Sequence, residues 1–370
     1  MKKYNICSFC VMDTSVPDIE FNENNQCNFC TSHISRLEYE KNQYQESSLK
    51  TLVERIKKSR GNSEYDCIIG VSGGVDSTYT AYIVKKILGL NPLAVHFDNG
   101  WNSELAVKNI HNCLDKLNID LHTHVVDWPE FREVQKSLIL SSIKNIEMVS
   151  DHAILSLLLK TANKHNIKFV LHGGNNATEG IMPLSWMETN HDKKLLTSIV
   201  KQFSNQKIVT LPTIGLFEFF HLLFIKKIKY IPILNYFDYD KESSIEILKK
   251  ELEYRPYKFK HDESIITRFF QRYILLEKYN IDKRRPHYSN LIISGQLTRL
   301  EAINLLKEPT YDKIEFEKDK EFFLKKFDFD EAAFDKILNE KPKSAKDYPS
   351  NSTLFNFIYR FSNLIRRATR

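Results

Sequence analysis

Long apolar runs are missing from this sequence. No segment approaches the ~18 consecutive apolar residues of a membrane-spanning helix. The N-terminal residues 1–5 lead into cysteines instead of the apolar core of a signal peptide. We therefore expect a cytoplasmic protein without a membrane span.

Several motifs are missing as well. The Walker A pattern G-x4-G-K-[ST] does not occur, and we find no internal repeat or low-complexity tract. Residue 2 is a lysine, so the chain is not expected to be an N-terminal cysteine amidase. If the reaction consumes ammonia, we expect another protein to supply it.

The composition is that of a folded protein with a mild positive charge. With 370 residues, of which 42% are hydrophobic, the chain has room for one large domain or two ordinary ones. The formal net charge of +6 suits anionic ligands such as nucleotides without demanding nucleic acid. No nucleic-acid partner is expected.

Cysteine is scarce but patterned. Four of the six cysteines form two C-x2-C pairs, Cys7 with Cys10 and Cys27 with Cys30, and sixteen residues separate the pairs. This spacing is typical of a four-cysteine zinc knuckle, in which four thiolates leave the Zn²⁺ no open position and make it structural. An iron–sulfur cluster or four buried thiols are the alternatives, and no disulfide is expected.

Strands and helices alternate between residues 47 and 171. A short buried strand is predicted at 66–71, further strands at 92–97, 121–126 and 168–171, and helices at 47–60, 77–88, 104–117, 129–142 and 150–165. The alternation predicts an α/β fold with a doubly wound parallel sheet, whose ligands lie at the carboxyl ends of the strands.

The remainder of the chain is predicted to be mostly helical. Basic and aromatic residues interleave in residues 216–230 and 354–370, which favours a helical layer over the sheet and an amphipathic terminal helix; peripheral contact with an anionic membrane is the alternative. We divide the chain into a zinc-knuckle module, an α/β domain, a helical substrate or partner region and a basic tail, at 1–45, 46–190, 191–340 and 341–370.

A glycine-rich turn follows the first predicted strand. Gly73 and Gly74 lack Cβ atoms and let the backbone approach phosphate oxygens, while the start of the next helix supplies free N–H groups. Ser72 and Ser77 add hydroxyl groups, and Asp76 can orient the loop or hold Mg²⁺. A plain helix entry is the alternative for a bare S-G-G turn.

The full S-G-G-x-D-S pattern resembles the PP-loop of asparagine, GMP, NAD and argininosuccinate synthetases and of several tRNA-modifying enzymes. That resemblance implies cleavage of ATP between the α- and β-phosphates, which leaves an adenylated intermediate and pyrophosphate. We expect the nucleotide to be bound by strand-end and turn residues: Val71, Ser72, Gly73, Gly74, Asp76, Ser77, Phe97, Asp98, Gly173, Gly174 and Asn175.

Further segments resemble one family, the N-acetyl sugar amidotransferases of bacterial surface-polysaccharide (O-antigen or capsule) biosynthesis. The resemblance covers roughly residues 4–335 and includes segments 7–14, 17–19, 96–103, 125–128, 151–153, 174–180, 280–285 and 289–291. It implies an ATP-dependent C–N ligase that converts an acetamido group of a sugar to an acetamidino group. Ammonia would come from a separate complex resembling the glutaminase and cyclase of histidine biosynthesis.

The loop after the second predicted strand supplies candidate contacts with the substrate. Asp98 would touch the nucleotide or the reacting amide, a solvated loop carboxylate being the alternative. Trp101 would pack against a base or sugar. Asp151 and His152 would begin a helix that faces the cleft, although Asp151 also suits a helix N-cap.

Two charged segments complete the predicted site. Glu179 is our candidate for guiding ammonia or balancing the amidinium cation. Lys283 and Arg284, with Arg285, would clamp the departing pyrophosphate, whose charge a basic group must offset; a solvated basic surface is the alternative.

Two other functions share some of these features. A PP-loop tRNA-thiolating enzyme would usually need a reactive cysteine near the nucleotide, but Cys67 is predicted at the opposite end of its strand from the PP-loop. A non-catalytic zinc-knuckle protein that binds RNA would leave residues 72–77 unexplained.

Overall fold

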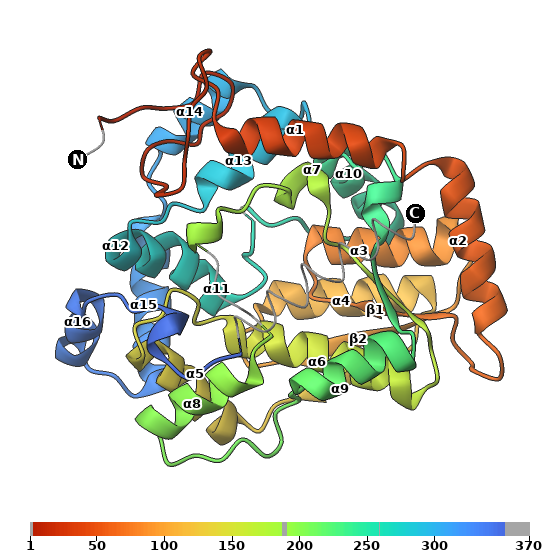
Figure 1. Cartoon of the computed structure of the whole chain (residues 1–370). Helices are drawn as coiled ribbons and strands as arrows, with labels where there is room; N and C mark the ends of the chain where they lie inside the picture. Colours follow the sequence, from red (N-terminus) through yellow and green to blue (C-terminus); the bar gives the residue numbers. More distant parts are fainter. Residues whose placement is uncertain (1–2, 187–190, 259, 352–370) are drawn as a thin grey trace.

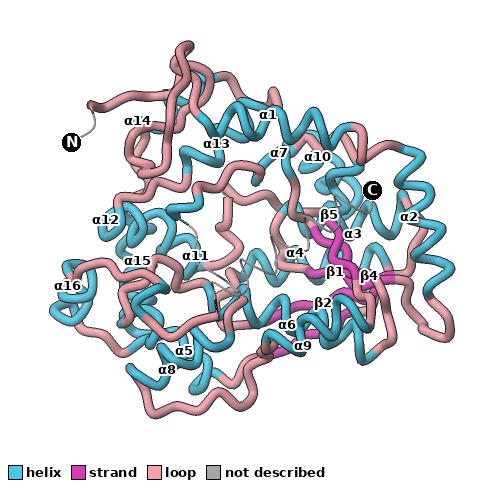
Figure 2. Tube along the Cα trace, viewed as in Figure 1, coloured by secondary structure: helices cyan, strands magenta, loops and turns pink. Residues whose placement is uncertain are grey.

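Five short strands form one parallel sheet in the computed structural model, which describes residues 3–186, 191–258 and 260–351 (Figures 1 and 2). Their order across the sheet is β3-β2-β1-β4-β5. The strands are β1 (Cys67–Gly70), β2 (Pro92–Asp98), β3 (Leu121–Val125), β4 (Phe169–His172) and β5 (Lys229–Pro232). The chain builds outward from β1 on one side and returns through β4 on the other, so the carboxyl ends of β1 and β4 frame the switch point.

Alternate residues of the central strands enter two separate cores. Ile69 of β1 and Leu171 of β4 lie in one core, while Ile68 and Val170 lie in the other. Because a strand buried on both faces has no polar side, these strands read as continuous apolar runs. The arrangement confirms the predicted doubly wound parallel sheet.

Helices cover both faces of the sheet. The face with Ile69 packs against α2 (Glu46–Ser59), α3 (Val75–Tyr82), α4 (Glu104–Leu117) and α10 (Lys241–Leu252). The other face packs against α5 (Trp128–Leu140), α6 (Met148–Lys164) and α8 (Lys193–Phe203). The helices and strands predicted between residues 47 and 171 are therefore present, with ends shifted by a few residues.

The C-terminal part is helical, as predicted. It contains α11 (Ile265–Phe269), α12 (Leu275–Tyr279), α13 (Arg284–Ile293), α14 (Arg299–Lys307), α15 (Lys313–Phe327) and α16 (Glu331–Asn339). In Figure 1, α12, α15 and α16 gather at the left, and α13 and α14 lie near the N-terminal segment. Within the described residues, no helix is both long and apolar enough to cross a membrane.

One segment was predicted wrongly. Residues 216–230 were expected to be helical, but only α9 (Leu216–Phe220) and the π-helical turn to Ile225 are. The chain then pairs Lys229 with Phe169 and continues as β5. The lysine-rich sequence did not predict this short edge strand, because the strand is ordered by its pairing with β4. The terminal helix expected at 354–370 lies outside the described residues.

The N-terminal module docks against α7 and the C-terminal helices. Its helix α1 (Asn28–Lys41) runs beside α7 (Asn176–Glu179) and α13 at the top of the molecule (Figure 1). His33 of α1 hydrogen-bonds the Asn176 carbonyl at 3.1 Å, and Gly180 lies so close that a Cβ atom there would overlap the His33 ring. The module therefore packs directly against the segment that follows β4.

Candidate active site

The glycine-rich turn forms a compact hydrogen-bonded loop between β1 and α3. The Ser77 hydroxyl donates to the Gly74 carbonyl at 3.0 Å, and the Ser72 and Ser77 hydroxyls lie 3.1 Å apart. Helix α3 begins after Gly74 with no side chain capping its first N–H groups. Those donors and the positive end of the helix dipole face the cavity beside the turn, an arrangement suited to an anion.

Close packing explains two glycines of this region. Gly73 has a φ of +80°, and a Cβ atom there would meet the Ala106 carbonyl oxygen at 2.6 Å. A Cβ atom on Gly173, which follows β4, would lie 2.7 Å from the Asp76 carbonyl oxygen. The turns after β1 and β4 therefore pack backbone to backbone at the switch point.

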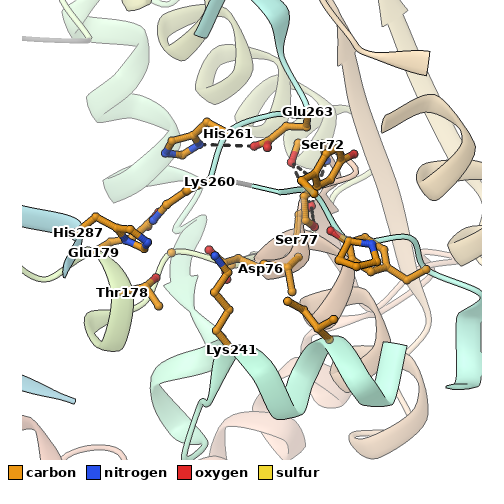
Figure 3. Close-up of a pocket in the computed structure, with 18 residues that line it drawn as sticks. Ser72, Asp76, Ser77, Thr178, Glu179, Lys241, Lys260, His261, Glu263 and His287 are labelled. Atoms are coloured by element: carbon orange, nitrogen blue, oxygen red, sulfur yellow. Dashed lines mark hydrogen bonds and ion pairs between the residues drawn. The ribbon is translucent and has the colours of Figure 1, made fainter. Parts of the chain in front are cut away.

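A cavity of about 240 Å³ opens beside the glycine-rich turn (Figure 3). Its wall is built from five parts of the chain that are far apart in sequence. They are the turn itself (Ser72, Gly74, Val75, Asp76, Ser77), the segment after β4 (Gly173, Gly174, Thr178, Glu179), α10 (Lys241, Ile245), the loop before α11 (Tyr254, Pro256, Tyr257, Lys260, His261, Glu263) and His287 of α13. We call this cavity the phosphate pocket.

Opposite charges meet in the phosphate pocket. Lys260 Nζ lies 2.8 Å from Glu179 Oε1, and Tyr239 donates to Asp76 Oδ1. Burial raises the pKa of Asp76, with Lys260 opposing the shift. Burial also acts to raise the pKa of Glu179, but Lys260 outweighs it and the net shift is downward. Glu179 is therefore ionised and paired, whereas the Asp76 carboxylate carries a costly negative charge.

Further cations and imidazoles face the same cavity. Burial and the neighbouring Lys260 lower the pKa of Lys241, although Asp76 opposes the shift. Burial, followed by Lys260 and Lys241, holds the pKa of His287 well below its ordinary value, so its ring is neutral at pH 7. His287 Nδ1 is buried without a hydrogen-bond partner among the described residues. In Figure 3, Lys241 and Lys260 extend into the same space.

A second cavity, of about 280 Å³, adjoins the first and shares Ser72, Ser77 and Glu263 with it. It lies across the ends of β1, β2 and β4 and is more apolar. Its lining includes Val71, Val95, Phe97, Ile154, Leu157, Leu158, Ile266, His172, Tyr230, Asn99, Glu147 and Asp151. We call this cavity the strand-end pocket. Its lining suits a partly apolar group.

Asp151 faces the strand-end pocket. It lies in the first turn of α6, not at the N-cap position, which is Glu147. Burial, together with the nearby Glu147 carboxylate, raises the pKa of Asp151 to about 7. His152 points elsewhere: its Nε2 accepts a hydrogen bond from the Ile214 N–H at 3.1 Å, and the residue is buried. Only the first of the two residues faces the cleft.

A hydrogen-bond chain fixes the loop after β2. His96 Nδ1 donates to the Val71 carbonyl at 2.8 Å, which leaves Nε2 to accept from Asn102 at 3.1 Å. Asp98 Oδ1 accepts from Asn102 and from the Gly100 N–H at 3.0–3.1 Å. Asp98 thus holds the loop and does not line either pocket, although its neighbours Phe97 and Asn99 line the strand-end pocket.

Trp101 corrects one prediction. Its side chain is 0% exposed, and its Nε1–H donates to Gln135 at 2.8 Å. The ring packs among Trp128, Phe322 and Phe327. Because it is wholly buried, Trp101 anchors the loop to the helical layer and is not available to a base or sugar.

The basic segment 283–285 does not form the expected clamp in the phosphate pocket. Arg284 pairs with Asp282 at 2.8 Å and donates to the Glu308 carbonyl. Arg285 pairs with Asp13 of the N-terminal module at 2.8 Å. Lys283 extends toward the Met182 sulfur, and burial lowers its pKa. None of the three lines the phosphate pocket. Arg284 and Arg285 have other partners, and Lys283, the N-cap residue of α13, interacts electrostatically with Glu147 and Asp151 of the strand-end pocket.

The other predicted site residues, including the catalytic candidate Glu179, divide between the two pockets. Val71 and Phe97 line the strand-end pocket, whereas Asp76, Gly74, Gly173, Gly174 and Glu179 line the phosphate pocket. Asn175 lines neither, since its side chain accepts from the Thr178 N–H at 2.9 Å and caps α7. Gly73 lies beneath the turn against Ala106.

Sequence reasoning missed the pocket's main cations. Lys241 follows the helix-capping Asp240, and Lys260 lies in the loop before α11. A signal for the second was present, because Lys260, His261, Asp262 and Glu263 are four consecutive polar residues. Their place opposite the PP-loop depends on tertiary packing that no local pattern encodes.

The four N-terminal cysteines converge. Their Sγ atoms all lie within 4.8 Å of one another, with 3.8 Å separating Cys7 from Cys30 and Cys10 from Cys27. Tetrahedral Zn²⁺ with bonds of about 2.3 Å places its sulfur ligands about 3.8 Å apart. Backbone N–H groups, including those of Cys10 and Cys30, lie 3.4–3.5 Å from Sγ atoms. The chemistry and spacing of the cluster fit a metal.

Two family models match separate parts of the chain. A model described as NAD synthase matches residues 44–182, and a model described as the C-terminal domain of LPS biosynthesis protein WbpG-like proteins matches residues 263–363. The chain belongs to the PP-loop family. The two matches together support the resemblance to the N-acetyl sugar amidotransferases.

This PP-loop protein is also similar to curated GMP synthases. It is 28% identical over 145 residues to the glutamine-hydrolyzing enzyme of Thermosipho africanus, and 38% identical over 69 residues to that of Aeropyrum pernix. These alignments cover 36% and 19% of this chain. They cover 26% and 13% of the GMP synthases, so the PP-loop protein spans about a quarter or less of these relatives.

Similar solved structures include an NMN synthetase from Francisella tularensis and an NH3-dependent NAD synthetase from Campylobacter jejuni, with TM-scores of 0.28 and 0.30. Their sequence identities are 16% and 12%, and the matches cover 54% and 85% of this chain and 71% and 98% of theirs. The U34-tRNA thiolase NcsA from Methanococcus maripaludis has a TM-score of 0.34 at 15% identity, with 82% and 88% of the two chains covered.

Membership of the PP-loop family implies ATP use and supports an ATP-dependent amidotransferase type of function.

Proposed function

We propose that this PP-loop protein converts an acetamido group of a nucleotide-linked sugar into an acetamidino group. ATP would be cleaved to AMP and pyrophosphate, and ammonia would come from a separate glutaminase complex in the cytoplasm. The observation that supports this most directly is the phosphate pocket, where an uncapped helix start and two lysines face one another across the PP-loop. The WbpG-like match at residues 263–363 favours a surface-sugar substrate.

The first step would form an O-adenylyl imidate. The acetamido oxygen attacks the α-phosphorus, the bond to the β-phosphate oxygen breaks, and the amide N–H proton is lost. We assign the departing pyrophosphate to the PP-loop N–H groups, Lys241 and Lys260, since these donors offset its charge. The nucleoside would occupy the strand-end pocket, which places the α-phosphate near Ser72 and Ser77, where the pockets meet.

The second step would replace oxygen with nitrogen. Ammonia adds to the imidate carbon, one of its protons moves to the sugar nitrogen, and the C–O bond to AMP breaks, so that AMP leaves and an amidinium cation remains. Glu179 is our candidate for balancing the amidinium charge, because it stays ionised beside Lys260. Neutral His287, with an unpartnered Nδ1 in the same wall, is placed to relay this proton from the added nitrogen to the sugar nitrogen. The net change exchanges one oxygen for one NH group.

Two metal ions belong to this proposal. Asp76 would hold Mg²⁺ beside the phosphates, since hard cations prefer carboxylate oxygens, and the ion would neutralise phosphate charge. Cys7, Cys10, Cys27 and Cys30 would hold a structural Zn²⁺. A [4Fe–4S] cluster would bind each cysteine through a different iron and spread the sulfur atoms farther apart than 4.8 Å.

The cysteines argue against the tRNA-thiolating alternative. Cys67 is wholly buried, and burial raises the pKa of its thiol. Cys113 is also buried, with a pKa raised to about 12. Neither lines the phosphate pocket or the strand-end pocket, and the other four cysteines point at one another. Thiolate is the reactive form of cysteine, so a sulfur-transfer role would lack its nucleophile here.

One assay tests the proposal. The protein is incubated with ATP, Mg²⁺, ammonium and candidate nucleotide-linked acetamido sugars, and AMP, pyrophosphate and sugar mass are followed. We expect AMP and pyrophosphate in equal amounts with a product about one mass unit lighter. AMP formation that depends on tRNA and ignores sugars would overturn the proposal in favour of tRNA modification.

A further inference from the structure

Helix α9 and its π-helical continuation to Ile225 are apolar on two opposite sides. On the inner side, Leu222 is buried and Phe219 and Leu223 pack against the core. On the outer side, Phe217 is 89%, Phe224 50% and Ile225 70% exposed. Exposed Glu218 and His221 are polar, but the outer side still leaves three large apolar side chains at the surface, where a single amphipathic helix would expose a polar face.

The outer side forms one continuous strip. Phe217, His221, Phe224 and Ile225 are all exposed and follow the four- and seven-residue spacing of a single helix face. Phe220 and Phe224 stack with ring centroids 5.6 Å apart. The exposed Lys226 and Lys227 follow at once. We call Phe217, Phe224, Ile225, Lys226 and Lys227 the docking strip.

Charge within residues 216–230 is mostly positive. Between residues 216 and 230 there are three lysines and one acidic residue, Glu218, which pairs with Lys160 of α6 at 3.5 Å. This ion pair sets α9 against α6 on the outside of the molecule (Figure 1). An apolar strip followed by exposed lysines complements a bilayer interface, where aromatic rings enter the headgroup region and lysines meet anionic lipid.

The end of the described chain lies near the same place. The Asn351 N–H donates to Asp192, next to His191, whose ring stacks on Phe219 of α9. From there the sequence continues for nineteen residues with four arginines and no acidic residue. The sequence that follows the last described residue therefore adds four positive charges to the chain.

We propose that the docking strip binds the surface of a membrane that contains anionic phospholipid. The proposal does not depend on the amidotransferase function. It makes the protein a peripheral membrane protein, held by shallow burial of aromatic side chains and attraction between lysines and lipid phosphates.

The test is co-sedimentation of the full-length protein with vesicles of phosphatidylcholine, with or without phosphatidylglycerol. We expect binding to the anionic vesicles that weakens as salt is added. F217S/F224S and K226E/K227E should each lower the partition coefficient by about tenfold or more. A matched control is L300S/I314S on α14 and α15, which removes two side chains that are 70% and 67% exposed elsewhere. It should bind as the wild type does.

Three results would overturn the proposal. The first is that the wild type binds vesicles and both strip variants bind equally well. The same conclusion follows if only R366E/R367E, in the C-terminal segment, abolishes binding. The second is a wild type that binds no vesicles but forms dimers that F217S/F224S disrupts, which would assign the strip to a second copy of the chain. The third is that the wild type neither binds vesicles nor forms dimers, and that protease cleaves the C-terminal segment of F217S/F224S but not that of the wild type. This result would mean that the C-terminal segment covers the strip. Equal melting temperatures of all variants verify the fold.

Discussion

The cysteine cluster and the phosphate pocket are both polar clusters at short turns before helices, but they are built in opposite ways. In the first, four sulfur atoms face one another within 4.8 Å and all four residues are 0% exposed. In the second, Asp76, Glu179, Lys241 and Lys260 line a cavity of about 240 Å³. A closed ligand set has no place for a substrate and suits a structural ion, whereas charges around an open cavity suit chemistry.

The two regions are nevertheless joined. Arg36 and Glu40 of α1 both hydrogen-bond the Asn176 side chain, and His33 bonds its carbonyl. Asn176 begins α7, the short helix that ends at Glu179 in the phosphate pocket. The closed cluster thus braces one wall of the open site, so changes in the two regions should differ in kind: loss of fold in one, loss of rate in the other.

The largest expected effect is that of Cys27→Ser. Cys27 caps α1 and completes the sulfur cluster, so the variant should lose its metal and melt at least about 10 °C below the wild type. Elemental analysis and a thermal melt measure both. Cys113→Ala is the matched control, because it removes a buried thiol outside the cluster. Equal metal content in the Cys27→Ser variant and the wild type would contradict a metal site.

The next largest expected effect is on the reaction rate alone, without a loss of stability. Asp76→Asn should lower pyrophosphate formation about a thousandfold, because the carboxylate faces the phosphates. Its melting temperature should not fall, since burial raises the pKa of Asp76 and makes the charged form costly. Asp98→Asn serves as control, because Asp98 holds its loop and lines neither pocket. Its rate should change only a few-fold. A rate for Asp76→Asn near that of the control would break the assignment.

A third pair of variants compares the observed cations with the expected ones. Lys260→Gln should lower the rate about a hundredfold by removing one donor to the pyrophosphate. Arg284→Gln should instead reduce stability by about 1–3 kcal/mol, since it deprives Asp282 and the Glu308 carbonyl of a partner. Rates and chemical denaturation of both variants decide the matter. If Arg284→Gln instead lowered the rate about a hundredfold and Lys260→Gln did not, the basic segment 283–285 would again be the candidate for the pyrophosphate clamp.

The same contrast explains what the sequence could predict. The cysteine pairs and the S-G-G-V-D-S turn are each encoded within a few residues, and the alternation of strands and helices located β1 to β4. Pairing partners that are distant in sequence were not visible. β5 became a strand through pairing with β4, and Trp101 was buried by Phe322 and Phe327 of α15. Lys241 and Lys260 reach the PP-loop only through the packing of α10 and the loop before α11.

The smallest expected effect concerns pH. Burial and the Glu147 carboxylate raise the pKa of Asp151 to about 7 in the folded protein, from an ordinary value of 3.8. Between pH 4 and 7 the folded carboxyl keeps a proton that the unfolded chain loses, so this group makes the wild type less stable as pH rises. Asp151→Asn lacks that dependence. Its melting temperature minus that of the wild type should therefore be about 2–4 °C larger at pH 8 than at pH 5. Thermal melts at the two pH values measure this difference. If the difference in melting temperature between Asp151→Asn and the wild type is the same at pH 5 and pH 8, then Asp151 is ionised at both pH values. The open site would then not raise the free-energy cost of that charge.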